Sequence, residues 1–257
     1  MKKLSILFLI VICSFLFSCT HKGNLSNQDT DYSKISIQSF LSAELITEYK
    51  KVLTELLAEP EDIDILKEIG KLYFFIGMEN QRLENTNKAI DIFKKVLKDN
   101  PQCSEIRAYM GAAYTLKARD FPIKWLANIT PLGFIRLFYV NEGIKKMNAA
   151  VKEEEMNPVI RSIRGNTCVN MPQIFGQFKK GLRDMELIIS WIKKPEMNPQ
   201  YADMLNDKSF KIFVYYYTGE AYLLQNKKQK AYSMFRLVKN INSDTPYGRA
   251  ARRRLNE

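Results

Sequence analysis

The chain has 257 residues, of which 46% are hydrophobic and 26% are charged, with 39 Lys and Arg against 28 Asp and Glu. Its ordinary apolar content, with 15 Phe and 13 Tyr, excludes an intrinsically disordered protein. Only the first 18 residues are strongly apolar, which excludes a protein with several membrane spans. The low content of Gly (11) and Pro (9) disfavours a turn-rich β-sandwich or barrel, so we expect an all-α protein.

Residues 1–18 predict an export signal, because two lysines precede an apolar stretch that is too short to span a bilayer comfortably. The stretch ends in the letters LFSC, which resemble a bacterial lipobox, where a cysteine after a small residue is lipidated and becomes the new N-terminus. The resemblance implies a diacylglycerol on Cys19 that holds the mature chain on a membrane. The alternative is an ordinary signal peptide that ends near a cysteine.

Residues 19–39 are polar and predict a flexible tether between the lipid and the folded body. The only histidine, His21, lies in this tether, where its closeness to the anchor argues against a catalytic role. Thr20 is not acidic, and by the resemblance this favours the outer membrane, with the protein facing the periplasm or the surface. Removal of two lysines with the signal lowers the net charge from +11 to +9, and export argues against nucleic acid as a partner of this basic chain.

From residue 40 onward, apolar residues recur at intervals of three and four, as in amphipathic helices. The clearest unit has Gly219 and Tyr222, then Ala231 and Phe235, with Pro246 beyond. This pattern resembles the tetratricopeptide repeat (TPR), in which L-G-x-x-Y is followed by A-x-x-x-F and a closing proline. The small residues would let two paired helices approach closely, while the aromatic rings fill the space between them.

The same pattern recurs upstream in three more units, the last of them degenerate. Their marker residues are Gly70, Tyr73, Ala89 and Phe93 in the first unit, Gly111, Tyr114, Gly143 and Met147 in the second, and Gly181, Met185 and Ile188 in the third. The resemblance implies an all-α fold over residues 40–257, a right-handed superhelical stack of antiparallel helix pairs with three to four repeats. Residues 40–57 and the tail after Pro246 would form capping helices, with the arginines of the tail facing water.

Residues 121–140 depart from the repeat pattern and form the most apolar part of the mature chain. Three interpretations remain open for this insertion. It folds over the groove of the stack as a lid, it presents Trp125 and Phe134 to a lipid surface or a protein partner, or it forms an extra helix buried against the stack.

In a stack of this kind, one face of each first helix lines a concave groove, and this groove is the predicted partner-binding site. Counting from the matched glycines places these residues there: Lys67, Lys71, Phe74, Ala108, Ala112, Thr115, Tyr216, Glu220 and Leu223. Lysines beside aromatic rings would suit an extended acidic peptide or polymer. The alternative is that these residues only pack between repeats, which we favour for Phe74 and Leu223.

Two further expectations concern contacts between helices. Arg161 or Arg164 lies among apolar neighbours and is expected to pair with a carboxylate such as Asp184 in the following helix. Cys103 and Cys168 have no metal-binding spacing, and their predicted offset of roughly 13 Å along the helices exceeds the separation that a disulfide tolerates. We therefore expect no metal site and no disulfide.

No set of nucleophile, base and orienting group can be assembled from the sequence, so we expect neither an enzyme nor a cofactor. The sequence predicts a membrane-anchored scaffold lipoprotein of the bacterial cell envelope that binds a protein or peptide partner. A first alternative is an accessory, ligand-binding or partner-binding component of a solute transport system, and a second is an envelope enzyme that acts on wall polymer.

Overall fold

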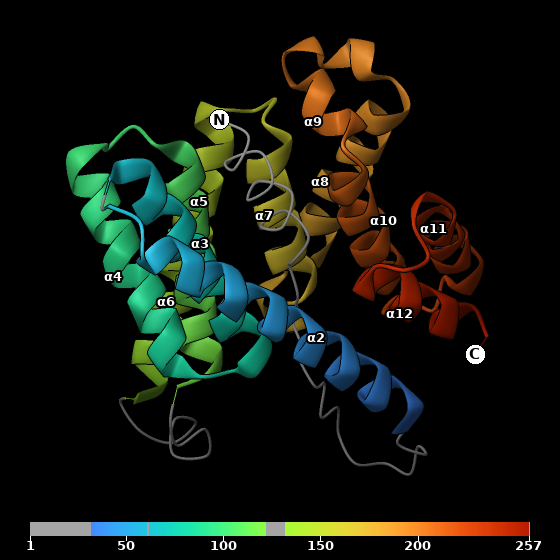
Figure 1. The fold of residues 1–257 in the computed structure, drawn as a ribbon, viewed down its shortest axis with the longest axis horizontal. Coiled ribbons are helices and arrows are strands. Elements are labelled where there is room, and N and C mark those ends of the chain that lie inside the picture. Colours follow the sequence, from blue (N-terminus) through green and yellow to red (C-terminus); the bar gives the residue numbers. More distant parts are fainter. Residues whose placement is uncertain (1–31, 61, 122–131, 257) are drawn as a thin grey trace.

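The computed structural model describes residues 32–60, 62–121 and 132–256 (Figure 1). The predicted export signal, Cys19, the first part of the tether and Trp125 lie outside the described residues. In the described ranges every regular element is helical, which confirms the expected all-α class. None of the helices in these ranges combines the length and the apolar character that a membrane crossing requires.

Eleven α-helices and three short 3-10 helices make up the described chain. In order they are α2 (Tyr32–Leu57), α3 (Ile63–Asn80), α4 (Leu83–Asp99), α5 (Ser104–Arg119), α6 (Leu132–Glu153), α7 (Pro158–Val169), η2 (Gln173–Phe175), α8 (Phe178–Lys193), η3 (Pro195–Met197), η4 (Pro199–Tyr201), α9 (Ala202–Asn206), α10 (Lys208–Leu223), α11 (Lys228–Ile241) and α12 (Pro246–Leu255).

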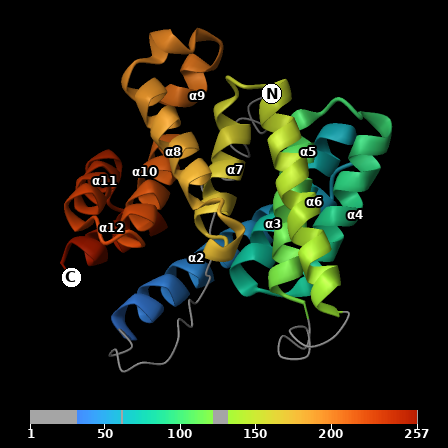
Figure 2. The ribbon, with the colours of Figure 1, turned by 180° about the vertical axis from the view of Figure 1, so that it is seen from behind.

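Adjacent helices pack as pairs, and four pairs account for the most extensive contacts: α3 with α4, α5 with α6, α7 with α8, and α10 with α11. The pairs follow one another across the molecule, as Figures 1 and 2 show from opposite sides. Contacts of α4 with α5, α5 with α7 and α8 with α10 join each pair to the next. The paired organisation that the repeats predicted is therefore present.

Polar caps and prolines define where several helices begin and end. Asp62 accepts hydrogen bonds from two backbone N–H groups at the start of α3, and Asn157 does the same at the start of α7. Pro158 and Pro246 stand at the first position of α7 and α12, where the missing N–H is tolerated. Gln81, in the left-handed region with φ 54°, ends α3.

The predicted small residues do lie at close helix–helix contacts. A Cβ added to Gly70 would lie 2.7 Å from a ring carbon of Phe93, and one added to Gly219 would lie 2.7 Å from a ring carbon of Phe235. Phe93 and Phe235 lie on the second helix of each pair, so the paired helices approach closely at these glycines. At Gly111 the contact is with backbone, because a Cβ would lie 2.7 Å from the carbonyl oxygen of Gly143.

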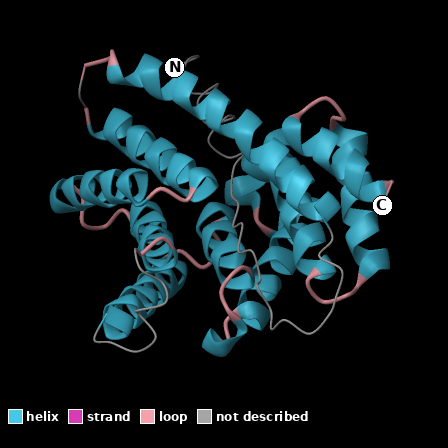
Figure 3. Cartoon of the chain, turned by 90° about the horizontal axis from the view of Figure 1, so that it is seen from below, coloured by secondary structure: helices cyan, strands magenta, loops and turns pink. Residues whose placement is uncertain are grey.

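The N-terminal helix α2 differs from expectation in both length and position. It begins at Tyr32, eight residues earlier than the predicted start, so residues 32–39 of the predicted tether are helical. These residues include no Gly or Pro, so nothing in their sequence stops the helix from extending backwards. Figure 3 shows α2 running along one side of the molecule. It packs on α3 at one end of the stack and on α12 at the other, where Arg249 Nη2 lies 2.7 Å from Glu44 Oε2.

Candidate functional site

Most of the predicted groove residues are buried rather than open to a partner. The relative exposure is 4% for Lys71, 5% for Thr115 and 0% for both Phe74 and Tyr216. The prediction that Lys71, Thr115 and Tyr216 line an accessible groove is therefore wrong, and Phe74 packs in the interior, as the alternative that we favoured for it holds. Lys67 is half-buried and pairs with Asp64 one turn away.

Lys71 is held in a buried charge cluster at the contact of α3 with α5. Its ammonium lies 2.8 Å from Glu68 and 2.7 Å from Glu105, with the ring of Tyr109 centred 5.5 Å away. Burial disfavours the charged form, but the carboxylates of Glu105 and Glu68 outweigh it and hold the pKa of Lys71 well above its ordinary value. The charge of Lys71 is thus satisfied inside the protein and is not offered to an acidic ligand.

The α10 residues of the predicted groove face the C-terminal helix. The ring of Tyr216 lies 5.2 Å from that of Tyr247 and 5.6 Å from that of Phe235. Glu220 accepts hydrogen bonds from Nε and Nη2 of Arg254, at 2.9 and 3.1 Å. Arg254 is only 4% exposed, so the expectation that every arginine of the tail faces water is wrong for this residue. Helix α12 covers the surface that the prediction left open.

The predicted arginine–carboxylate contact is confirmed, and it involves both arginines. Arg164 donates from Nε and Nη2 to the two oxygens of Asp184, at 2.7 and 2.8 Å, and Arg161 Nη1 donates to Asp184 Oδ1 at 2.7 Å. Arg164 also donates to Asn148 of α6 at 3.1 Å. Asp184 is 3% exposed, so the cluster joins three helices in the interior.

Cys103 and Cys168 are both free thiols. Burial raises the pKa of the Cys168 thiol to about 12, so this cysteine is not a nucleophile at neutral pH. In the described ranges, no three side chains among His, Cys, Asp and Glu gather closely enough to hold a metal ion.

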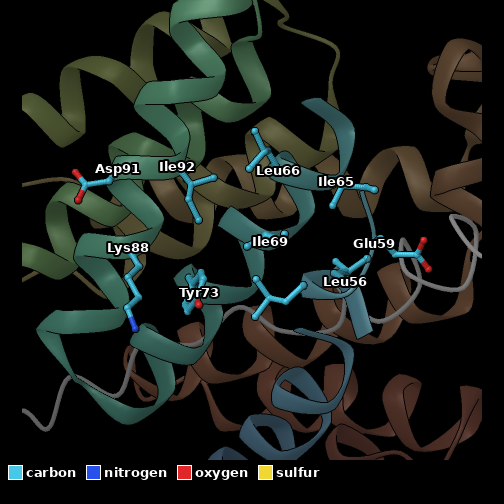
Figure 4. Close-up of a pocket in the computed structure, with 10 residues that line it drawn as sticks. Leu56, Glu59, Ile65, Leu66, Ile69, Tyr73, Lys88, Asp91 and Ile92 are labelled. Atoms are coloured by element: carbon cyan, nitrogen blue, oxygen red, sulfur yellow. The ribbon is translucent and has the colours of Figure 1, made fainter. Parts of the chain in front are cut away.

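An open apolar groove lies between the end of α2, helix α3 and helix α4 (Figure 4). Its volume is about 500 Å³. Its lining is mainly aliphatic, with one tyrosine: Leu56, Leu57, Ile65, Leu66, Ile69, Tyr73 and Ile92. Leu57 is 57% exposed, so this wall of the groove is open to solvent. The groove combines an apolar lining with an opening to solvent, and it is our candidate site.

Charged residues of both signs surround this apolar floor. Glu59, Lys88 and Asp91 complete the lining. Lys88 pairs with Glu84 at 2.8 Å and lies 5.4 Å from the centre of the Tyr73 ring, which fixes the ring at the rim. An apolar floor with a mixed polar rim suits the apolar face of an amphipathic segment.

The described part of the insertion is exposed on one face and packed on the other. Residues 132–140 begin α6, in which Phe134 and Phe138 are 76% and 58% exposed while Val140 is buried and Tyr139 stacks on Tyr114 of α5. The interpretation of the insertion as an extra buried helix is therefore wrong for Phe134 and Phe138. Trp125, its other predicted contact residue, lies outside the described residues.

The described residues form an all-helical protein of packed helix pairs, with an apolar, solvent-open groove beside helix α2. The chain matches no protein-family model, no curated protein and no solved structure.

Proposed function

We propose that the protein is a scaffold lipoprotein of the bacterial cell envelope that binds a segment of a partner protein in the apolar groove. The paired helices form a right-handed TPR-like stack, and a lipid on Cys19 anchors the mature chain, with the outer membrane favoured. The groove between α2, α3 and α4 is the observation that carries the proposal. Its function is recognition, without covalent chemistry.

The lining of the groove supports an amphipathic helix of a partner protein as its occupant. Leu57, Leu66 and Ile92 offer an apolar floor, while Lys88 and Asp91 offer one charge of each sign at the rim. An amphipathic helix places apolar side chains on one face and charged ones beside it, which matches this arrangement. A strongly acidic peptide has no such match, since the buried Lys71 is already neutralised by Glu68 and Glu105.

The size of the groove favours a second candidate function. A volume of about 500 Å³ lies within the range of small-molecule sites, which are also mostly apolar. On this alternative the protein would be an accessory component of a solute transport system and would hold a small apolar ligand at the same place.

Crosslinking at one exposed leucine of the groove, with a matched leucine elsewhere as the control, distinguishes these possibilities. Leu57 lines the groove, Leu224 follows α10, and both are 57% exposed. A photo-crosslinking amino acid at position 57 is expected to capture a discrete partner in cells, whereas the same group at position 224 captures none. The Ile92→Asp variant should abolish the capture, and the crosslinked partner peptide should have helical apolar periodicity.

Other outcomes of this experiment favour the alternatives. A bound non-protein mass in native mass spectrometry, lost in Ile92→Asp, would favour the small ligand instead. Equal capture at positions 57 and 224 would refute the groove as the site. The anchor is tested separately by the intact mass of the mature N-terminus, which should include a diacylglycerol and lose it in Cys19→Ala.

A further inference from the structure

The first two turns of α6 form an apolar surface that no part of the described fold covers. Phe134, Ile135, Leu137 and Phe138 are 76%, 40%, 44% and 58% exposed, and the first buried residue of the helix is Val140. At about 200 Å² for a fully exposed large side chain, the four expose on the order of 400 Å². An exposed apolar patch of this size on a monomer is often a functional interaction surface.

The width of this apolar surface favours a broad apolar medium over a single partner helix as its binding partner. With about 100° between successive residues of a helix, the four side chains spread over an arc of about 160°. A partner helix requires a narrower stripe of the kind found at helix–helix seams. A planar apolar medium accepts side chains over the whole arc.

The charges at this end of the α5–α6 pair fit a lipid headgroup layer. Residues 132–141 include one basic residue, Arg136, and no acidic one. Arg136 donates to the carbonyl of Ala118 at 3.0 Å, and the Lys117 ammonium lies 4.9 Å from the centre of the Tyr139 ring. Aromatic and aliphatic side chains beside Lys and Arg are typical of segments that lie in the membrane interface.

The starts of α2 and α6 lie on the same side of the molecule. Both are at the lower edge of the view in Figure 1, α2 at the right and α6 at the left, whereas α9 lies at the upper edge. Thirteen residue steps separate Cys19 from Tyr32, and they span at most about 45 Å when fully extended. A lipid on Cys19 therefore allows this side of the folded body to face the bilayer.

We infer that the start of α6 is a second membrane contact, at which Phe134, Ile135, Leu137 and Phe138 enter the interface of an anionic bilayer. The inference rests on the proposed lipid anchor and goes beyond it, because it fixes the orientation of the body on the membrane. The two acyl chains of the proposed diacylglycerol already give a stable attachment, and this surface adds a defined orientation to it.

The test uses the full chain in vesicles of phosphatidylcholine and phosphatidylglycerol, with Cys103→Ser as background. An environment-sensitive fluorophore is attached at Phe134→Cys, and as a control at Met197→Cys, an exposed position in η3 before α9. Brominated lipids are expected to quench the probe at position 134 at least about threefold more than the probe at position 197. Phe138→Asp should abolish this difference, while Leu224→Asp, with matched exposure, should leave it unchanged.

Each other outcome overturns the inference in a distinguishable way. A probe at position 134 that stays in water while the protein remains on the vesicles refutes the second contact but leaves the anchor intact. A chain that does not associate with vesicles, with no lipid in its mass, refutes the anchor itself. A blue shift at position 134 that appears only at high protein density, without quenching by brominated lipid, assigns the surface to a second copy of the chain.

Discussion

Substitution of Gly111 by alanine tests the close approach of α5 and α6 on which the fold depends. A Cβ at this position would lie 2.7 Å from the carbonyl oxygen of Gly143 and 2.9 Å from Cγ of Met147. The first of these atoms belongs to backbone, which has no rotamer to change. The added methyl group must therefore push the two helices apart.

The expected change in stability has the opposite sign to the intrinsic helix preference. In an exposed helix interior, Gly→Ala raises stability by about 1 kcal/mol. Overpacking costs about 1–3 kcal/mol, and the upper end applies where two backbones must separate. The net effect of Gly111→Ala is then a loss of about 2 kcal/mol in the free energy of unfolding.

Denaturant unfolding followed by circular dichroism measures this change. Asn141→Ala, at an exposed position of α6, is the control and should change stability by less than about 0.5 kcal/mol. Gly143→Ala should cost as much as Gly111→Ala, since its Cβ would lie 2.6 Å from the carbonyl oxygen of Gly111. The double variant should lose less than the sum, because the first methyl group has already separated the helices. If Gly111→Ala is as stable as the parent, the helices do not meet at backbone distance and the small-residue argument fails.

Three other measurements follow from buried groups. Asp184→Ala leaves two arginines without their carboxylate and should lower the free energy of unfolding by about 3–5 kcal/mol; a loss below about 1 kcal/mol would refute the structural role of the cluster. Burial raises the pKa of Glu79 to about 7 from 4.5, so the folded state binds this proton more tightly than the unfolded state. Stability should therefore fall by up to about 3 kcal/mol as pH rises from 4.5 to 7, and a Glu79→Gln variant that keeps this slope would contradict the assignment. Under native conditions a thiol reagent should modify Cys103 and spare Cys168, which should react only after unfolding; mass spectrometry of the two peptides decides this.

The parts of the fold that the sequence predicted correctly are those set by local spacing. Gly70 and Gly219 lie on the apolar stripes of their helices, so their position where paired helices approach closely was predictable. The pairing of Arg164 with Asp184 was predictable for the same reason, since both lie in one helix pair.

The parts that sequence reasoning missed depend on contacts between distant segments. Arg249 reaches Glu44 across 205 positions of the chain, and no periodicity encodes where α2 crosses the stack. The burial of Tyr216 follows from α12, whose place against α10 is set by that same long-range packing. The spacing of Lys71 on its helix gave no sign of the carboxylate of Glu105, which comes from α5 and pairs with it.

The candidate groove was missed because its residues looked like core. Ile65, Leu66 and Ile69 follow one another on α3 together with the fully buried Leu72 and Phe75, so the helix is apolar on more than one face. A helix that is apolar all round is usually buried, and here one of its faces remains open. The excess of apolar residues on α3 was the feature of the sequence that could have indicated the groove.

Helix α2 lines part of the groove, packs along the stack and leads to the segment of the proposed anchor. As a helix of 26 residues it is about 39 Å long, enough to reach from α12 to the far side of α3. Its middle part buries Leu45 and Tyr49, the latter 5.7 Å from the ring of Phe75, while its last turn supplies Leu56 and Leu57 to the groove. The groove therefore exists only while α2 lies across the stack. The same helix leads to the segment that bears the proposed lipid, so the proposed membrane contact at the start of α6 would also set the direction in which the groove faces.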